Sequence, residues 1–171
     1  MTRVIGTTLA IACLAALPAR GDVPEDVQSC PSCHFCGMDR DKFGHSRMEI
    51  LRQDGKVVGT CSLHCAALEL AASVDGPPKA VRVADMQSRQ LVDADSAIWV
   101  VGGSKPGVMT RRAKWAFADR AAAEAFVKEN GGRVATFEEA PQAAFEDMYQ
   151  DVKMIREKRK AMRAKMNEAR D

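Results

Sequence analysis

Residues 30–38 read CPSCHFCGM and residues 60–65 read TCSLHC, and these two cysteine clusters decide how the chain is expected to fold. Together they contain a Cys-x2-Cys pair and a Cys-x3-Cys pair, formed by Cys33, Cys36, Cys61 and Cys65. A Cys-x2-Cys knuckle presents two thiols from one tight turn, and a Cys-x3-Cys at the start of a helix presents two more on one face. The positive end of a helix also lowers the pKa of a thiol, which favours the metal-binding thiolate. The spacing therefore predicts a metal site of the treble-clef kind.

The residues around these four cysteines bear on which metal is bound. Four thiolates in a closed tetrahedron are typical of structural Zn(II). Cys30 is a fifth cysteine nearby, and Met38 offers a thioether, which Cu(I) accepts readily. His34 and His64 lie within the two clusters and are further candidate ligands. The spacing alone favours zinc, whereas Met38 and Cys30 favour Cu(I).

The first 21 residues have the pattern of an export signal. Arg3 precedes the apolar run Val4 to Leu17, which is shorter than the about 20 residues of a membrane-spanning helix, and a cleavage site is expected before Asp22. The alternative is a lipoprotein signal that ends at residue 12, with Cys13 lipidated. Both interpretations place the chain in the periplasm or another extracytoplasmic compartment, the second as a membrane-anchored lipoprotein. Disulfides are common there, but an odd number of mature cysteines fits a complete disulfide framework poorly.

The rest of the sequence predicts an α+β protein with two similar strand-strand-helix-strand units, at residues 30–86 and 93–140. The first unit is expected to contain strands 47–51 and 56–60, helix 62–74 and strand 80–83. The second is expected to contain strands 97–101 and 114–117, helix 120–130 and strand 133–136. Because only the first unit carries cysteines, we infer that they serve a site and not the packing of the unit.

Two segments flank these units. Residues 22–29 are predicted to be a polar linker, and residues 141–171 a long helix. An apolar stripe predicts packing at the base of this helix, and it consists of Phe145, Met148, Val152 and Ile155. Residues 156–170 are dominated by Lys and Arg, which predicts either a solvated tip or a contact with a partner or with anionic lipid.

Composition and motifs exclude several functions. A net charge of +2 and an aromatic content of 5% argue against a nucleic-acid partner. The sequence contains no Ser-His-Asp pattern and no phosphate-binding loop, so we predict that the protein is not an enzyme. Thiol-disulfide exchange at Cys30 and Cys33, or mercury handling, is the enzymatic alternative.

The hexapeptide from Cys33 to Met38 resembles the CxxCGM signature of the NosL family, the nitrous oxide reductase accessory copper proteins. The resemblance continues through residues 93–103 and 116–132, and it covers about residues 30–140. It implies a two-unit α+β fold, Cu(I) binding, a lipoprotein anchor, and delivery of Cu(I) outside the cytoplasm to a copper enzyme such as nitrous oxide reductase. It also implies that Cys36 and Met38 are copper ligands, and Met109 matches a methionine of the family's second unit.

The segment from Cys61 to Cys65 is similar to the treble-clef (TRASH-like) heavy-metal domains of trafficking and sensing proteins. The expected ligand set is therefore Cys33, Cys36, Met38, Cys61, Cys65 and Met109, with Cys30, His34 and His64 as further candidates. The alternatives to a copper chaperone are a zinc-stabilised treble-clef interaction module, with the basic helix as its functional surface, and a general heavy-metal trafficking protein.

Overall fold

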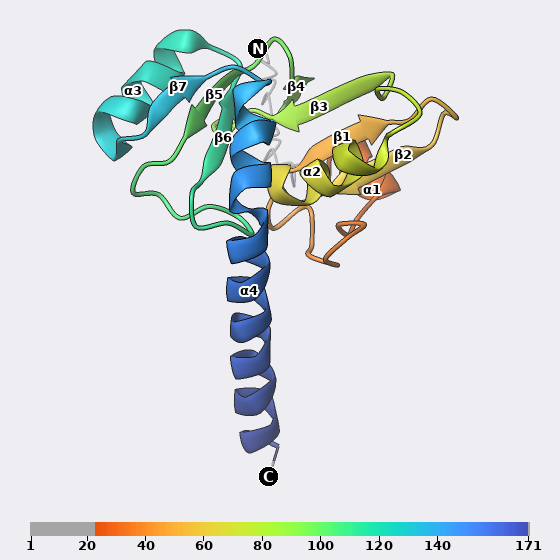
Figure 1. Ribbon diagram of the computed structural model, residues 1–171, viewed down its shortest axis with the longest axis vertical. Helices are drawn as coiled ribbons and strands as arrows, with labels where there is room; N and C mark the ends of the chain where they lie inside the picture. Colours follow the sequence, from red (N-terminus) through yellow and green to blue (C-terminus); the bar gives the residue numbers. More distant parts are fainter. Residues whose placement is uncertain (1–22, 171) are drawn as a thin grey trace, which may run out of the picture.

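The computed structural model describes residues 23–170, and it shows two α+β units beside a long C-terminal helix (Figure 1). The predicted export signal and Cys13 lie outside the described residues. Among the helices of residues 23–170, none combines the length and the apolar character needed to cross a bilayer.

The first unit is a four-stranded antiparallel sheet in the order β2-β1-β3-β4. Its elements are β1 (Met48–Leu51), β2 (Val57–Thr60), α2 (Leu63–Ala72), β3 (Ala80–Ala84) and β4 (Leu91–Asp93). The first two predicted strands pair as an antiparallel hairpin, with Met48 opposite Thr60, and Gly55 supplies the positive φ of its turn. The short strand β4 has no counterpart in the sequence prediction.

The second unit is a three-stranded antiparallel sheet in the order β6-β5-β7, covered by one helix. Its elements are β5 (Ile98–Val101), β6 (Lys114–Phe117), α3 (Arg120–Asn130) and β7 (Arg133–Ala135). Asp119 caps α3, because its carboxylate accepts a hydrogen bond from the Ala122 amide at 2.8 Å. The two units share the order strand-strand-helix-strand, so the predicted fold class is confirmed.

Strand β5 joins the two hydrophobic clusters of the molecule. Its side chains alternate between the faces of the sheet, as in any strand. Trp99 and Val101 pack into the core that α2, the first sheet and the base of the C-terminal helix share. Val100 packs on the other side, in a cluster with Trp115, Phe117 and the buried cysteines. The cysteines of the first unit therefore lie against apolar side chains of the second.

The segment predicted as a linker contains a helix instead. Helix α1 (Glu25–Ser29) buries Val27, which is 3% exposed, and Asp26 forms ion pairs with Arg40 and Arg47. One apolar residue leaves no periodic pattern, and the arginines that hold Asp26 follow it by 14 and 21 positions. The local sequence therefore could not reveal this helix.

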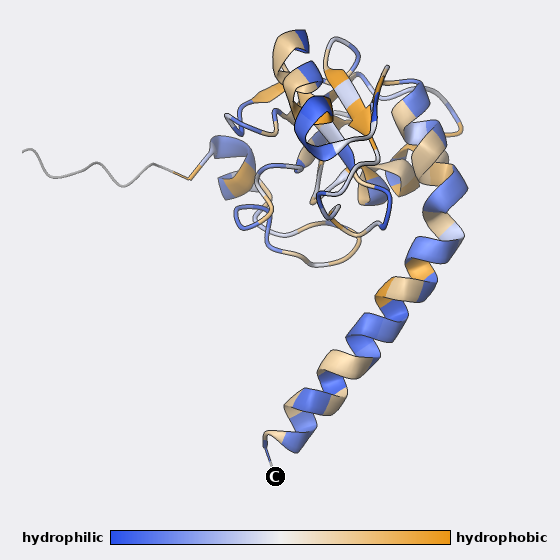
Figure 2. Cartoon of the chain, turned by 90° about the vertical axis from the view of Figure 1, so that its left-hand side faces the viewer, coloured by the Kyte–Doolittle hydropathy of each residue, from blue (hydrophilic) through white to orange (hydrophobic). Residues whose placement is uncertain are grey.

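The long helix α4 (Glu139–Glu168) runs along both units and then extends away from them (Figures 1 and 2). Met148 packs against the core, and Val152 and Ile155 are half-buried, as the apolar stripe predicted. Phe145 differs from the prediction, because it is 45% exposed. From Arg156 onward every described residue of α4 is exposed.

Candidate metal centre

Four cysteines converge at one point of the first unit. The sulfur atoms of Cys33, Cys36, Cys61 and Cys65 all lie within 4.8 Å of one another. The Cys36 sulfur is 3.4 Å from that of Cys61, which is 3.8 Å from that of Cys65. A disulfide would require about 2.05 Å. A tetrahedron of sulfurs about 2.3 Å from a central metal has edges of about 3.8 Å, so the four-thiol cluster fits a metal ion.

The Cys-x2-Cys pair lies in a tight knuckle turn. The Gly37 amide donates to the Cys33 carbonyl at 2.9 Å, and the Cys33 amide donates to the Met38 carbonyl at 2.8 Å. Gly37 adopts φ of 74°, which a residue with a side chain tolerates poorly. The His34 amide donates to the Gly59 carbonyl at 2.9 Å and ties the knuckle to β2. The CxxCGM pattern thus folds back so that both thiols face the same point.

The Cys-x3-Cys pair lies at the junction of β2 and α2. Cys61 directly follows β2, and Cys65 lies in the first turn of α2, four residues later. Both are buried, at 0% and 1% exposure. The Ser46 hydroxyl donates to the Cys61 carbonyl at 2.8 Å, which fixes the backbone just before the helix. Ser62 occupies the N-cap position of α2, although its side chain forms no capping hydrogen bond.

Proximity makes the four thiols titrate as a group. Hydrogen bonds from Cys36, Cys61 and Cys65 hold the pKa of Cys33 far below its usual range. Cys33 raises the pKa of Cys36, but hydrogen bonds from Cys61 and Cys65 outweigh this effect, and the pKa falls to about 7. The pKa values of Cys61 and Cys65 are raised, chiefly by their hydrogen bonds to Cys33. A cluster that loses its first protons easily and its last ones reluctantly is suited to a cation that replaces those protons.

Met38 and Met109 lie beside this cluster. Both pack against the hydrophobic cluster that contains Cys33, Cys61 and Cys65, and both are partly buried. Met109 has a φ of 61°, which is uncommon for a bulky residue and marks a constrained loop. The thioethers of the two units thus lie near one another, since both methionines line one cavity.

The other predicted candidates lie outside the four-thiol cluster. Cys30 is a free thiol that does not belong to the group of four. The ring of His34 is exposed and contacts Phe35 edge-on at 4.9 Å. His64 is 3% exposed and faces α4, with its Nδ1 3.6 Å from a carboxylate oxygen of Asp151. His64 therefore contacts α4 and is not part of the four-thiol cluster.

Arg40 is a structural residue of the site that the sequence analysis missed. Its side chain is fully buried, and its guanidinium donates to the carbonyls of Asp26, Cys30, Met48 and Thr60. A Cβ atom at Gly59 would lie 2.7 Å from both Arg40 and Cys30, so the close approach depends on this glycine. The signal available in the sequence is a lone arginine directly after the knuckle, which is indistinguishable from a surface arginine.

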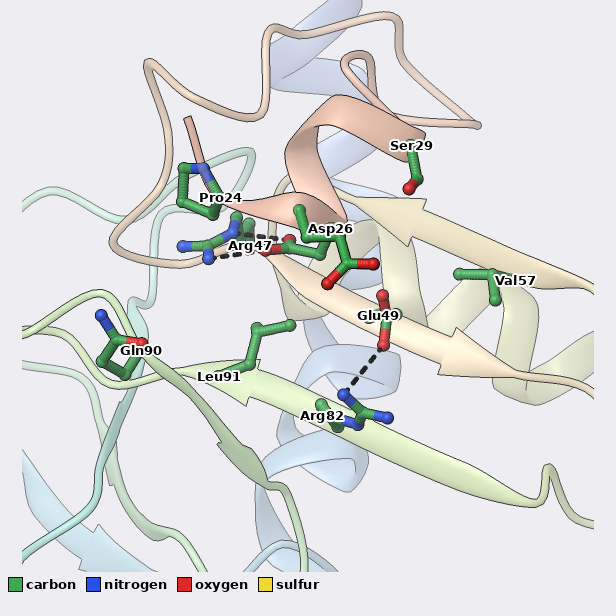
Figure 3. Close-up of a pocket in the computed structure, with 10 residues that line it drawn as sticks. Pro24, Asp26, Ser29, Arg47, Glu49, Val57, Arg82, Gln90 and Leu91 are labelled. Atoms are coloured by element: carbon green, nitrogen blue, oxygen red, sulfur yellow. Dashed lines mark hydrogen bonds and ion pairs between the residues drawn. The ribbon is translucent and has the colours of Figure 1, made fainter. Parts of the chain in front are cut away.

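One cavity of the described residues lies away from the cysteines. It has a volume of about 670 Å³ and lies between α1 and the first sheet (Figure 3). Arg47 and Asp26 pair within it, as do Arg82 and Glu49. Neither cysteine nor methionine lines this cavity, so it offers no soft ligand of the kind found at the four-thiol cluster.

Comparison with known proteins points to one family. The model of the NosL family matches residues 24–145, more than half of the chain, which confirms the resemblance noted from the sequence. A crystal structure of the copper chaperone NosL from Shewanella denitrificans superposes with a TM-score of 0.56 and 28% sequence identity. This similarity covers 67% of the present chain and 92% of the other. No curated protein sequence matches the chain significantly.

Proposed function

The chain belongs to the NosL family, and from this premise we propose that it is an exported copper chaperone. The observation that carries the proposal is the convergence of four cysteine sulfurs within 4.8 Å, with two methionines packed beside them. Such a set of soft donors suits Cu(I) and offers nothing to hard cations. The solved structure with which the chain aligns is itself described as a copper chaperone. The family is not one of enzymes, in agreement with the prediction from the sequence.

The proposed ligands are Cys36 and Met38, helped by Cys33, Cys61, Cys65 and Met109. Cys36 is the only thiol of the four-thiol cluster that is not fully buried, and its pKa of about 7 makes it ionise near neutrality. Cu(I) accepts two or three soft ligands, so an incoming thiolate or thioether can attach before an old ligand leaves. Transfer by such ligand exchange needs no change of oxidation state.

The proposed recipient is an exported copper enzyme, such as nitrous oxide reductase, or its assembly machinery. The export signal inferred from residues 1–21 places donor and recipient in the periplasm or an equivalent compartment. Membrane association would come from lipidation of Cys13 or from the basic part of α4. Binding to vesicles of anionic lipid is compared between the full chain and an unlipidated Cys13→Ser variant. Loss of binding in the variant would indicate the lipid anchor, and retained binding would indicate the basic part of α4.

Reconstitution with Cu(I) under reducing conditions tests the proposal. We expect one Cu(I) to remain bound in the presence of a moderate Cu(I) chelator, and Met38→Ala and Cys36→Ser to lose it. Met86→Ala is the matched control, because Met86 packs against the same hydrophobic cluster but does not belong to the proposed ligand set. Failure to retain Cu(I) together with tight binding of Zn(II) would contradict the copper proposal.

A specific observation also favours a second role for the four-thiol cluster. Sulfur separations of 3.4 Å and 3.8 Å suit a closed tetrahedral site, and three of its thiols are buried. This geometry supports the alternative of a zinc-stabilised treble-clef module. In that case Met38→Ala would leave the metal content unchanged, and removal of zinc would unfold the chain.

A further inference from the structure

A second cavity, with a volume of about 400 Å³, shares Met38 and Met109 with the proposed ligand set. Four methionines line it, from the knuckle, the loop before β6 and helix α4: Met38, Met109, Met154 and Met162. Neither a carboxylate nor a histidine is among its lining residues. Thioethers are neutral and polarizable, so this methionine pocket offers ligands for a soft monovalent metal and none for a hard cation.

Helix α4 is fixed in the position that places its methionines there. Asp147 pairs with Arg112 at 2.8 Å and with Lys114. One turn further along, the carboxylate of Asp151 accepts a hydrogen bond from the Arg111 amide at 3.0 Å. These anchors come from the chain directly after Met109. The helix therefore docks on the loop that carries the second-unit thioether.

The methionine pocket is also tied directly to the knuckle. The guanidinium of Arg159 donates to the Cys36 carbonyl at 2.9 Å, across 123 positions of sequence. Met154 is half-buried, whereas Met162 is 62% exposed. The pocket therefore lies beside the knuckle at Met38 and reaches the exposed Met162 along α4.

The spacing of the two helical methionines shows how a metal would use them. Met154 and Met162 are eight residues apart, which corresponds to about 12 Å along a helix. Two methionine side chains span such a distance only when both are fully extended toward a shared ion. The pair therefore fits two successive positions better than one coordination sphere, with Met154 on the inner side near Met38 and Met109.

We propose that the methionine pocket is a thioether relay through which Cu(I) leaves the cysteines. This inference rests on the proposed copper function and adds its route of exit. It assigns a role to Met154 and Met162, which lie beyond residues 24–145 matched by the family model. Helix α4 thereby becomes part of the transfer machinery in this chain.

Each step of the relay is a ligand exchange at constant oxidation state. A bond forms between Cu(I) and the Met154 sulfur, the bond to the Cys36 sulfur breaks, and the released thiolate takes a proton from water. The bond to the Met154 sulfur then breaks, the ion moves along the pocket and binds the Met162 sulfur, and the recipient's ligand finally replaces Met162. Lys158 and Arg159 also line the pocket, and their positive charges oppose long residence of a cation. The relay positions are therefore weaker than the four-thiol cluster, as transfer requires.

Silver(I) titration of the full chain labelled with 13C at its methionine methyl groups tests the relay positions. Silver(I) is the probe because it is a soft monovalent ion that is not oxidised in air. The first equivalents of silver(I) bind the thiols, which hold this ion more tightly than thioethers do, so the later equivalents report on the methionines. We expect the methyl resonances of Met154 and Met162 to shift, and those of Met148 and Met166 to stay in place. Shifts that avoid Met154 and Met162, or that are equal for all methionines, would overturn the relay.

Release kinetics provide the second measurement. In a chain loaded with one Cu(I), the double variant Met154→Leu/Met162→Leu should lose the metal to a chelator about tenfold more slowly, because the exit barrier rises. Affinity for the first Cu(I) should be unchanged. Met166→Leu is the matched control on the same helix outside the pocket. Equal release rates in the double variant and the control would overturn the relay.

The two measurements separate this inference from the copper function. A chain that retains no Cu(I) against the chelator contradicts the proposed function, whatever the methionine resonances do. If the chain retains Cu(I) tightly but the methyl resonances of Met154 and Met162 do not shift with silver(I), the proposed function stands and the relay is excluded. Leucine preserves the volume and apolar character of methionine, so the variants should fold, and circular dichroism checks that they do.

Discussion

Replacing Arg40 with methionine should lower the free energy of unfolding by about 3 kcal/mol, which is a large part of the about 5–15 kcal/mol typical of a folded chain. The guanidinium is fully buried and donates to four carbonyls, those of Asp26, Cys30, Met48 and Thr60. It also pairs with the Asp26 carboxylate at 2.9 Å. Methionine fills part of the volume but donates no hydrogen bond, so these acceptors lose their partner.

The magnitude follows from what remains after the substitution. Removing one member of a buried ion pair typically costs about 3–5 kcal/mol, because the other charge is left unpaired. Here Arg47 still donates to both carboxylate oxygens of Asp26, at 2.7 Å and 2.8 Å. The carboxylate therefore stays compensated, and the loss should lie near the lower end of that range.

Urea unfolding of the reduced, metal-free chain measures this loss through the fluorescence of Trp99 and Trp115, both of which are buried. With a slope of about 2 kcal/mol per molar urea, the midpoint should fall by about 1.5 M. Arg82→Met is the control, since Arg82 is 53% exposed and pairs with Glu49 at 3.5 Å. An exposed pair contributes less than about 1 kcal/mol. If Arg40→Met and Arg82→Met shift the midpoint equally, the reasoning from burial is refuted.

Three further predictions concern the same region. Gly59→Ala should cost about 1–3 kcal/mol in urea unfolding, because its Cβ would lie 2.7 Å from Arg40 and Cys30; an unchanged midpoint would contradict this. Burial raises the pKa of Asp26, but hydrogen bonds and charge from the arginines lower it further, so its net value lies below 3.8. Its stabilisation is complete above pH 3.8 and is lost as the pH falls through the lowered value. The stability gap between the parent and Asp26→Asn should therefore close in acid, and a gap independent of pH would refute the assignment. In the metal-free chain, iodoacetamide should modify Cys36 first among the four cluster thiols, with a half-maximal rate near pH 7, as peptide mass spectrometry would show; earlier labelling of a buried cluster thiol would contradict the order.

The parts of the fold that the sequence predicted are those with local signals. The turn at Gly55 and the cap at Asp119 each act within a few residues, and the elements beside them form where they were expected. The convergence of the cysteines was also predictable, because a knuckle and a helix start leave few ways to orient their thiols. Local chemistry therefore accounts for the elements and for the four-thiol cluster.

The features that the sequence left undecided depend on distant partners. Helix α1 forms where Asp26 meets two arginines more than a dozen residues away. Phe145 continues the apolar stripe of α4 but lies 45% exposed, because docking of the helix is set by ion pairs such as that of Asp147 with Lys114. The methionine pocket depends on the same docking. The spacing of apolar residues along α4 does not reveal which face of the helix these ion pairs turn toward the core.

The cysteine site belongs to the first unit in sequence but to both units in its packing. Cys33, Cys61 and Cys65 share a hydrophobic cluster with Trp115 and Phe117 of β6, a strand without any cysteine. This wall keeps water from three of the thiols and leaves Cys36 half-exposed on the side where the methionines lie. The unit without cysteines therefore closes the site on one side, and Cys36 is left as the thiol that an incoming soft ligand could reach.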